Sequence, residues 1–380
     1  MTRTAVVVGA GIGGLGAAIG LRRTGWEVTV LERVAAVRPV GAGLVLQANG
    51  LRCLDALAVG AAVRAGGQAE VTGGTRRSDG RWLTRIESGD LEHVLGTPSL
   101  GIHRAALHAI LLDALPSGTV VTGAEVVGVT ASGDVTYRRQ DKDREATLSA
   151  DLVIGADGIR STVRRALWPE AAAPVHIGVA AWRGVTPVWK RDLIVAISWG
   201  RGAEFGMVPL ADGRVYWFGA LNAAPGDPPG DERARVLARF GRWHDPIPDL
   251  IDATETILHD DLACLDEPLT TYVKGRVALL GDAAHAMTPH LGQGANQALE
   301  DAVVLAAVAH RADGLRAYDL RRRPRSQRLA KASRTVGRFG QQLANPVAVT
   351  ARNTLVRLIP PRLTLRSMAR LADWHPPSLD

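Results

Sequence analysis

The N-terminal part of the chain alternates apolar runs with a glycine-rich turn. Ala5–Val8 is a short continuous apolar run, which is typical of a parallel strand buried on both faces. After the turn, apolar side chains recur at helical spacing until Gly25, and Val28–Leu31 is a second apolar run. Two such strands joined through one helix predict a βαβ unit with a right-handed crossover.

Later segments repeat this α/β pattern. Arg104–Leu115 places leucine and isoleucine on one helical face, and 151–154 is a short strand that ends at a glycine. Residues 277–280 form another apolar run, and a long helix is predicted from about residue 296 to 310. These pieces are expected to assemble into one parallel sheet with helices on its faces.

Residues 175–222 have a different organisation. Short strand patterns follow one another there, separated by turn residues and without long helices between them. This order predicts a mixed or antiparallel sheet. The fold class is therefore α/β: a Rossmann-like domain, an inserted mixed or antiparallel sheet domain and a helical C-terminal segment. The predicted boundaries are 1–72, 97–173 and 274–335 for the first domain, 73–96 and 174–273 for the second, and 336–380 for the helical segment.

The C-terminal segment combines helical spacing with positive charge. Residues 311–380 contain 15 Lys or Arg and 4 Asp or Glu, while the whole chain has a formal charge of +7. Breaks are expected near Pro324, Pro346 and Pro360, which leave short helices. We expect their apolar face to pack on the same chain, because none is long enough to bind a membrane strongly by itself. The rest of the chain is slightly acidic and has no nucleic-acid-reading motif, so a nucleic-acid partner is not expected.

Composition sets further limits. The 380 residues are 46% hydrophobic and 22% charged, which is ordinary for a globular protein. Cys53 and Cys264 cannot form a disulfide framework and lack metal-site spacing, so no cysteine-built metal site is expected. No apolar run reaches the ~18 residues of a membrane span, and no secretory signal is recognisable. A cytoplasmic protein is the resulting expectation.

The glycine turn carries the first chemical signal. Gly9-x-Gly11-x-x-Gly14 leaves a strand and opens a helix, a position where glycines let the backbone approach a pyrophosphate. Glu32 ends the next strand, 18 residues after Gly14, and is placed to accept both ribose hydroxyls of an adenosine. An acid at this place disfavours a 2′-phosphate, so FAD or NAD is expected instead of NADP.

Two further motifs favour an extended ligand. Residues 155–164, Gly-Ala-Asp-Gly-Ile-Arg-Ser-Thr-Val-Arg, follow one buried strand, and Gly281-Asp282-Ala-Ala-His285 follows another. The second motif continues into a glycine-rich turn, 292–296, that opens the long helix. Ligands of open α/β sheets bind at the carboxyl ends of the strands. One ligand that spans all of these loops therefore fits better than a short one.

In their order, these motifs resemble those of the class A flavoprotein monooxygenases, the para-hydroxybenzoate hydroxylase-like FAD-dependent hydroxylases, across roughly residues 1–310. The resemblance implies that the first domain binds FAD and that the inserted sheet binds the substrate. It implies FAD contacts for Gly9, Gly11, Gly13 and Gly14 at the pyrophosphate, for Glu32 and Arg33 at the adenosine, for Arg104 and Asp157, for Asp282 at the ribityl chain, and for Gly43, Pro289, Gly292, Gly294, Ala295 and Asn296 near the isoalloxazine ring.

The resemblance also implies a reaction. NADH or NADPH reduces the FAD, a flavin C4a-hydroperoxide forms with O₂, and one oxygen atom enters an aromatic or polycyclic small molecule. The flavin carries the difficult step, so no metal and no obligatory catalytic side chain are expected; Pro289 and His290 are candidates. His290 stands where many relatives carry asparagine or a small polar residue. A monomer or a homodimer is expected, and the alternative activity is that of a geranylgeranyl-reductase-like FAD-dependent oxidoreductase that adds no oxygen.

The inserted sheet supplies the candidates for substrate contacts: Arg183, Arg201, Glu204, Tyr216 and Phe218. Strand alternation puts Tyr216 and Phe218 on one face of the sheet. Their rings would stack on a planar substrate or fill the core of the sheet. Urate-hydroxylating relatives are expected to carry an arginine near position 204, so the acid Glu204 argues against a urate-like anion.

Overall fold

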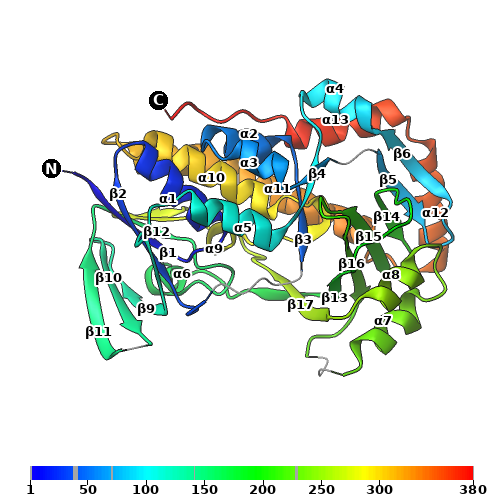
Figure 1. Ribbon diagram of the computed structural model, residues 1–380, viewed down its shortest axis with the longest axis horizontal. Helices are drawn as coiled ribbons and strands as arrows, with labels where there is room; N and C mark the ends of the chain where they lie inside the picture. Colours follow the sequence, from blue (N-terminus) through cyan, green and yellow to red (C-terminus); the bar gives the residue numbers. More distant parts are fainter. Residues whose placement is uncertain (1, 37–41, 70–71, 141, 227–229, 380) are drawn as a thin grey trace.

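The computed structural model contains two large sheets at opposite ends of an elongated molecule, with long helices running between them (Figure 1). It describes residues 2–36, 42–69, 72–140, 142–226 and 230–379. Four regions of sheet occur in this part of the chain, with six, seven, three and three strands. The α/β class with an inserted sheet and a helical C-terminal segment is thereby confirmed.

The first large sheet is built around the predicted βαβ unit. Ala5 aligns with Val28 on one side and with Leu152 on the other, and both pairings are parallel. All three residues are buried, because helices cover this sheet and leave its central strands no polar face. Its strands, in spatial order, are β18 (Val273–Lys274), β19 (Val277–Leu279), β12 (Leu152–Gly155), β1 (Thr4–Val8), β2 (Glu27–Glu32) and β8 (Val120–Thr122).

The second large sheet is mixed, as predicted. Its neighbouring strands pair antiparallel except for β14 and β5, which are parallel. The strands in spatial order are β17 (Ile257–Cys264), β13 (Val175–Val185), β16 (Val215–Asn222), β15 (Ala203–Pro209), β14 (Ala196–Trp199), β5 (Thr72–Arg77) and β6 (Trp82–Glu87). Two small sheets accompany it: β3 (Gly43–Leu46), β7 (Leu100–His103) and β4 (Gln68–Ala69), and, beside the first large sheet, β11 (Lys142–Ser149), β10 (Asp134–Arg139) and β9 (Ala124–Val129).

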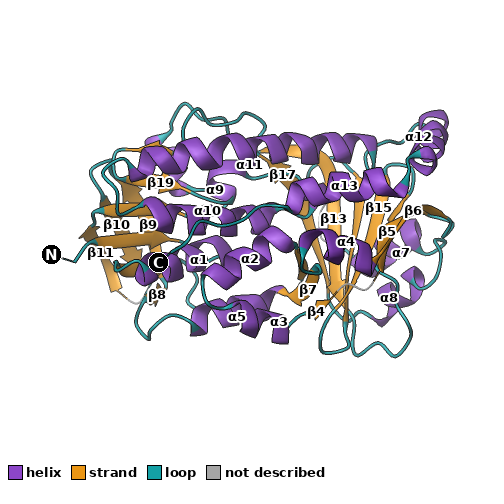
Figure 2. Ribbon diagram, turned by 90° about the horizontal axis from the view of Figure 1, so that it is seen from above, coloured by secondary structure: helices purple, strands orange, loops and turns teal. Residues whose placement is uncertain are grey.

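The helices connect and cover these sheets. Figure 2 shows α10 and α11 side by side along the length of the molecule, and α10 also packs on α1. The helices are α1 (Ile12–Arg23), α2 (Ala48–Ala56), α3 (Gly60–Ala65), α4 (Ser88–Leu95), α5 (Arg104–Asp113), α6 (Thr162–Leu167), α7 (Glu232–Phe240), α8 (Ile247–Ala253), α9 (Asp282–His285), α10 (Gly294–Val308), α11 (Gly314–Phe339), α12 (Pro346–Leu358) and α13 (Pro361–Ala372), with a short 3₁₀ helix, η1 (Pro289–Leu291). No helix in the described ranges is long and apolar enough to cross a bilayer.

The predicted break at Pro324 is wrong. α11 continues through this residue to Phe339, so the predicted boundary at residue 336 also falls inside the helix. Proline removes the hydrogen bond to the carbonyl of Leu320, four residues earlier. Both Pro324 and Leu320 are exposed, so water can take the place of the missing donor. The breaks near Pro346 and Pro360 are confirmed, since each proline lies at a helix start.

The segment after α11 packs on the second large sheet, as expected. The Gly202 amide donates to the Leu343 carbonyl at 2.9 Å, and the Asn222 side chain donates to the Gln342 carbonyl at 2.8 Å. The Arg352 guanidinium is buried and donates to the Gly340 carbonyl at 2.6 Å. The C-terminal segment therefore supplies backbone acceptors to the turn between β14 and β15 and to the end of β16.

Deleting residues 341–380 is expected to give aggregated or flavin-poor protein. The deletion would remove the partners of Gly202 and Asn222 and expose the apolar surface that α12 and α13 cover. Size-exclusion chromatography with detection at the flavin absorbance measures both effects. A soluble, fully flavinated and active truncated protein would show that the segment is dispensable.

Candidate active site

The glycine turn between β1 and α1 combines tight packing with one open position. Gly9 has φ +102°, and a Cβ on it would lie 2.6 Å from the carbonyl oxygen of Ala156. A Cβ on Gly14 would overlap the carbonyl oxygen of Gly9. Gly11 differs from both, because a Cβ there meets nothing within 4 Å. Free space therefore lies directly in front of the Gly11 backbone.

The first turn of α1 has the features of an anion-binding site. Gly11 is the N-cap residue and provides no side-chain cap, and no acidic residue lies in the first turn. The orphan amides of a helix start carry partial positive charge and bind phosphate well. Gly13 lies on the opposite, packed side, where its Cβ would come 2.8 Å from Leu280 and 3.0 Å from Ala298. It brings α1 close to α10 and does not line the open space.

Glu32 is held beside this turn. One of its carboxylate oxygens accepts the amide of Ala10 at 2.7 Å, and the other accepts the amide of Val34 at 2.9 Å. Its orientation at the carboxyl end of β2 is thereby fixed, as an acceptor for ribose hydroxyls requires. Arg33 is exposed beside it, and Arg104 is exposed at the first position of α5, where its amide donates to the Ala42 carbonyl at 2.9 Å.

The two later motifs meet through a buried arginine. Arg164 lies in the 155–164 motif, is 2% exposed, and donates to the carbonyl of Ala283 in the other motif at 2.8 Å. Asp157 accepts the amides of Thr162 and Val163 with one oxygen, at 2.7 and 3.1 Å. Its other oxygen is buried with no partner among the described residues. Sequence reasoning quoted Arg164 but gave it no role.

Asp282 is available for a ligand. It follows β19 at the start of α9, its side chain is exposed, and it makes no hydrogen bond or ion pair with the part of the chain that the structure describes. Gly281 before it has φ +57°, which favours glycine and turns the chain sharply out of the strand. The carboxylate thus lies at the carboxyl end of a strand, and its contact with the ribityl chain stays a prediction.

The turn that opens α10 resembles the turn that opens α1. Gly292 has φ +62°, a Cβ on Gly294 meets nothing within 4 Å, and the first turn of α10 has no acid and no side-chain cap. Ala295 lies within this first turn. Asn296 fixes the turn to β3, since it accepts the amide of Gln47 at 3.0 Å and donates to the Gly292 carbonyl at 2.9 Å. Pro289 precedes the turn and is exposed.

A buried charged network lies behind this turn. Arg322 is 1% exposed and donates to Asp301 at 2.7 Å and to Glu300, both of which are fully buried. Arg325 adds two hydrogen bonds to Glu300, at 2.7 and 2.8 Å. Asn49 donates to Glu300 at 2.7 Å, which ties α2 to α10. The network therefore fixes the helix whose N-terminal turn carries the candidate flavin residues.

The charges in this network compensate one another. Burial alone would raise the pKa of Asp301, but the charges of His285 and Arg322 hold it below its ordinary value. Burial would also raise the pKa of Glu300, but the charges of Arg322 and Arg325 hold it below its ordinary value. His285 lies 2.6 Å from Asp301 and has a structural role here. Sequence reasoning missed Arg322, although its spacing from the other buried residues of α11 would have indicated an inward position.

One face of the second large sheet carries four of the five substrate candidates. Trp217 packs with Phe205 on the side of α7 and α8, so Tyr216 and Phe218 face the other way, as predicted. Tyr216 packs against Ala42, and a Cβ on Gly43 would lie 2.5 Å from its ring. β3 thus lies directly on this face of the sheet. Gly41, which precedes β3 by two residues and belongs to the same glycine-containing stretch as Gly43, lies outside the described residues.

Two of the four candidates on this face, Arg183 and Glu204, are charged. Arg183 pairs with Asp260 on the neighbouring strand. Burial raises the pKa of Tyr216 to about 12, and the charges of Arg183 and Arg104 only partly offset this effect. Glu204 shares its side of β15 with Gly206 and Val208, which contact Phe218 and Tyr216. Its carboxylate therefore belongs to the same face as the two rings.

Glu204 is a buried acid for which the described residues provide no cationic partner. It is 5% exposed, and its hydrogen-bond donor is the Trp199 indole at 3.3 Å. Burial raises its pKa to about 7, and the Trp199 hydrogen bond opposes this only slightly. Near neutral pH the group is thus divided between an acid and a carboxylate, which is unusual for a glutamate.

The structure separates Arg201 from the other substrate candidates. It lies at the exposed turn between β14 and β15, and its guanidinium faces the carbonyl of Ala344 at 3.3 Å. His290, in η1, packs on α11, where a Cβ on Gly337 would overlap its ring. Burial lowers the pKa of His290, and the neighbouring Gln341 amide only partly offsets this effect, so the ring is neutral at pH 7.

The residues present fit a flavin dinucleotide. The backbone is open at Gly11 and Gly294, and each of these glycines lies at a helix start without a side-chain cap. Among the described residues, Asp282 and one oxygen of Asp157 have no partner. All of these groups lie at loops that follow parallel strands or at the turn that opens α10. Residues 2–333 match the family model described as an FAD binding domain. The chain belongs to this family of FAD-binding proteins.

Curated relatives match this chain over almost its whole length. It is 37% identical over 371 residues to the aurachin C monooxygenase/isomerase of Stigmatella aurantiaca, with 94% of each chain covered. It is 35% identical, with the same coverage, to the 2-heptyl-3-hydroxy-4(1H)-quinolone synthase of Pseudomonas aeruginosa. The Klebsiella pneumoniae HpxO structure complexed with FAD and uric acid has a TM-score of 0.88 at 28% identity and covers 97% of this chain and 96% of its own. An FAD-dependent monooxygenase is therefore confirmed, and the reductase-like alternative is not supported.

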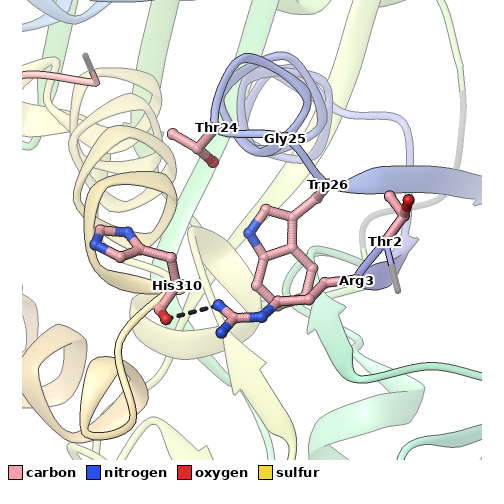
Figure 3. A pocket seen from close by; sticks show the side chains of 6 residues that line it. All are labelled: Thr2, Arg3, Thr24, Gly25, Trp26 and His310. Carbon is pink, nitrogen blue, oxygen red and sulfur yellow. Dashed lines mark hydrogen bonds between the residues drawn. The ribbon is translucent and has the colours of Figure 1, made fainter.

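A hollow of about 550 Å³ lies at the other end of α1 and takes no part in this site. In Figure 3 the Arg3 guanidinium crosses beside Trp26 and donates to the carbonyl of His310, at 2.6 Å. The Thr24 hydroxyl is bonded to backbone carbonyls of α1. Arg3 therefore joins the start of β1 to the residues after α10, whereas the Thr24 bonds stay within α1, and both contacts are structural.

Proposed function

We propose that this monooxygenase uses NADH or NADPH to insert one oxygen atom from O₂ into a neutral, fused aromatic compound that carries an N–H or O–H donor. The observation that carries this proposal is Glu204, a buried acid on the same face as Tyr216 and Phe218, with no cationic partner in the described part of the chain. An acceptor at this position favours a donor on the ligand and disfavours an anion. The relative from Pseudomonas aeruginosa is named for a 2-heptyl-3-hydroxy-4(1H)-quinolone, and this name supports a neutral bicyclic substrate.

The chain's own residues would bind and orient the reactants. Gly11 and the α1 amides would hold the pyrophosphate, Glu32 the ribose, and Asp282 the ribityl chain. The α10 turn, with Gly294 and Asn296, would lie along the isoalloxazine ring. When bound, FAD supplies hydride acceptance and O₂ activation, chemistry that side chains lack.

The substrate would lie between β3, η1 and the face of the second sheet. Tyr216 and Phe218 would offer apolar ring surface, and the buried surroundings would exclude water. His290, kept neutral by burial, would present an uncharged ring from the η1 side. A monomer or homodimer in the cytoplasm remains the expectation from the sequence.

A substrate panel tests the reaction. 4(1H)-Quinolone, phenol and salicylate are incubated with the holoenzyme and either NADH or NADPH under air. We expect a quinolone-type compound to accelerate reduced-nicotinamide consumption and to give a product heavier by one oxygen atom, with ¹⁸O₂ as the label source. A product that gains no oxygen, or a label that comes from water, would overturn the proposal.

Glu204→Gln tests independently whether the ligand donates a hydrogen bond to Glu204. Binding of 4(1H)-quinolone, followed by the change in flavin absorbance, is expected to weaken about tenfold at pH 8, where the wild-type group is a carboxylate. In the wild type, binding is expected to tighten as pH rises through about 7, the pKa of Glu204, and the variant is expected to lose this dependence.

A matched control lies on the other face of the sheet. Glu232 also accepts a tryptophan indole, that of Trp182 at 2.6 Å, so Glu232→Gln changes a similar pair away from the site. The raised pKa of Glu204 has a stability consequence as well. Its stabilising, protonated form is lost as pH rises through 7, so Glu204→Gln should raise Tm at pH 8 and leave it unchanged at pH 4. Equal 4(1H)-quinolone binding by the wild type, Glu204→Gln and Glu232→Gln would contradict the proposed role of Glu204.

A further inference from the structure

The two C-terminal helices leave an apolar surface uncovered. Val347 is 76% exposed, Leu358 74%, Leu355 54% and Leu363 53%. Ile359, in the corner between α12 and α13, and Met368 on α13 are also exposed, at 38% and 43%. Large apolar side chains exposed together in this way mark an interaction surface more often than a solvated one. We call Val347, Leu355, Leu358, Ile359, Leu363 and Met368 the corner patch.

The corner patch lies opposite the faces with which these helices pack on the protein. On α12 the buried residues are Val349, Arg352 and Val356, and the exposed Val347, Leu355 and Leu358 recur on the other side of the helix. On α13, Ala369 and Ala372 are buried, whereas Leu363 is exposed with Arg366 and Arg370 at helical spacing. Intramolecular packing therefore accounts for one face of each helix and leaves the other without a partner.

Positive charge surrounds the corner patch. No aspartate or glutamate occurs between Asp319 and Asp373. Arg357, Arg362, Arg366 and Arg370 are exposed and make no ion pair or ring contact with any described residue. Asp373, at the end of α13, pairs with Arg52, and helix α4, which packs on α13, carries Asp90 and Glu92. The four guanidinium groups next to the uncovered aliphatic side chains thus have no ion-pair partner within the described ranges.

We propose that the corner patch docks the enzyme on an anionic lipid bilayer. Apolar side chains would enter the interface while the arginines bind lipid phosphates, the arrangement of interfacial amphipathic helices. A second copy of the chain fits less well, because a twofold contact through this patch would place the same arginines opposite one another. Figure 1 places α12 and α13 beside β5 and β6, so the bilayer would meet the end of the molecule that holds the second large sheet.

Vesicle flotation with the full-length holoenzyme tests the docking. The protein is mixed with vesicles of phosphatidylcholine alone or with 30% phosphatidylglycerol. Binding is expected to the anionic vesicles and not to the neutral ones, and to decrease at high salt. Each arginine near the surface contributes about fivefold to the partition coefficient, so Arg362→Glu/Arg366→Glu is expected to weaken binding by at least 25-fold.

The controls separate docking from misfolding and from self-association. Arg22→Glu/Arg23→Glu reverses two exposed arginines at the end of α1 and is expected to bind vesicles like the wild type. Leu358→Ser/Leu363→Ser is expected to lose binding while it keeps its flavin and its Tm. No binding to anionic vesicles, equal loss in the α1 variant, or a dimer that dissociates when Leu358 and Leu363 are changed would each overturn the proposal.

Discussion

Gly11→Val is expected to give a folded protein that purifies without its yellow colour. The backbone at Gly11 is extended, with φ −70°, and a Cβ there meets no atom within 4 Å, so the apoprotein can accommodate a side chain. The same side chain would fill the space in front of the α1 amides, where the pyrophosphate has to lie. We expect FAD occupancy to fall at least tenfold, measured as the ratio of flavin to protein absorbance.

The matched control is Gly73→Val. Gly73 also has free space around its Cβ, but it lies in β5, away from the flavin loops. It should keep its flavin, and both apoproteins should have wild-type Tm values. Asp282→Ala, which removes the unpartnered carboxylate of α9, is expected to load FAD weakly for a different reason, the loss of a hydroxyl acceptor. Full flavin retention in the Gly11 and Asp282 variants would contradict the assignment of both loops.

Arg322→Met is expected to destabilise the protein by about 3–5 kcal/mol, because it removes the guanidinium that pairs with both buried carboxylates. Glu300 and Asp301 are both fully buried, and the remaining Arg325 contacts only the first of them. Arg323→Ala, one residue away, breaks a partly exposed ion pair with Asp319 and should cost less than about 1 kcal/mol. Chemical denaturation of the two apoproteins gives the comparison.

The same network predicts an acid limit. Because the folded-state pKa values of Glu300 and Asp301 lie below their ordinary values of 4.5 and 3.8, their ionised forms stabilise the fold at neutral pH. This stabilisation is lost as pH falls through the folded-state values. The free energy of unfolding of the wild type should therefore decrease below about pH 4, and that of Arg322→Met should decrease less steeply. Parallel pH profiles would contradict the role of Arg322.

The local sequence determined the parts that depend on neighbours along the chain. The apolar run at Ala5–Val8 and the glycine turn specified a buried parallel strand, a tight turn and a helix start, because backbone sterics and strand burial leave few alternatives there. The alternation at Tyr216–Phe218 likewise gave the correct faces. Pro324 was misjudged, since the cost of a proline depends on whether water reaches the carbonyl that it leaves free.

The tertiary structure decided what depends on contacts between distant segments. Arg322 is one of fifteen basic residues after position 310, and only the packing of α11 on α10 makes it the buried partner of Glu300 and Asp301. Arg201 and Glu204 are three residues apart, yet one lies at an exposed turn and the other is buried beside Trp199. Burial and counter-charges set a side chain's pKa and its access to a ligand, and both arise from segments that the local sequence does not specify.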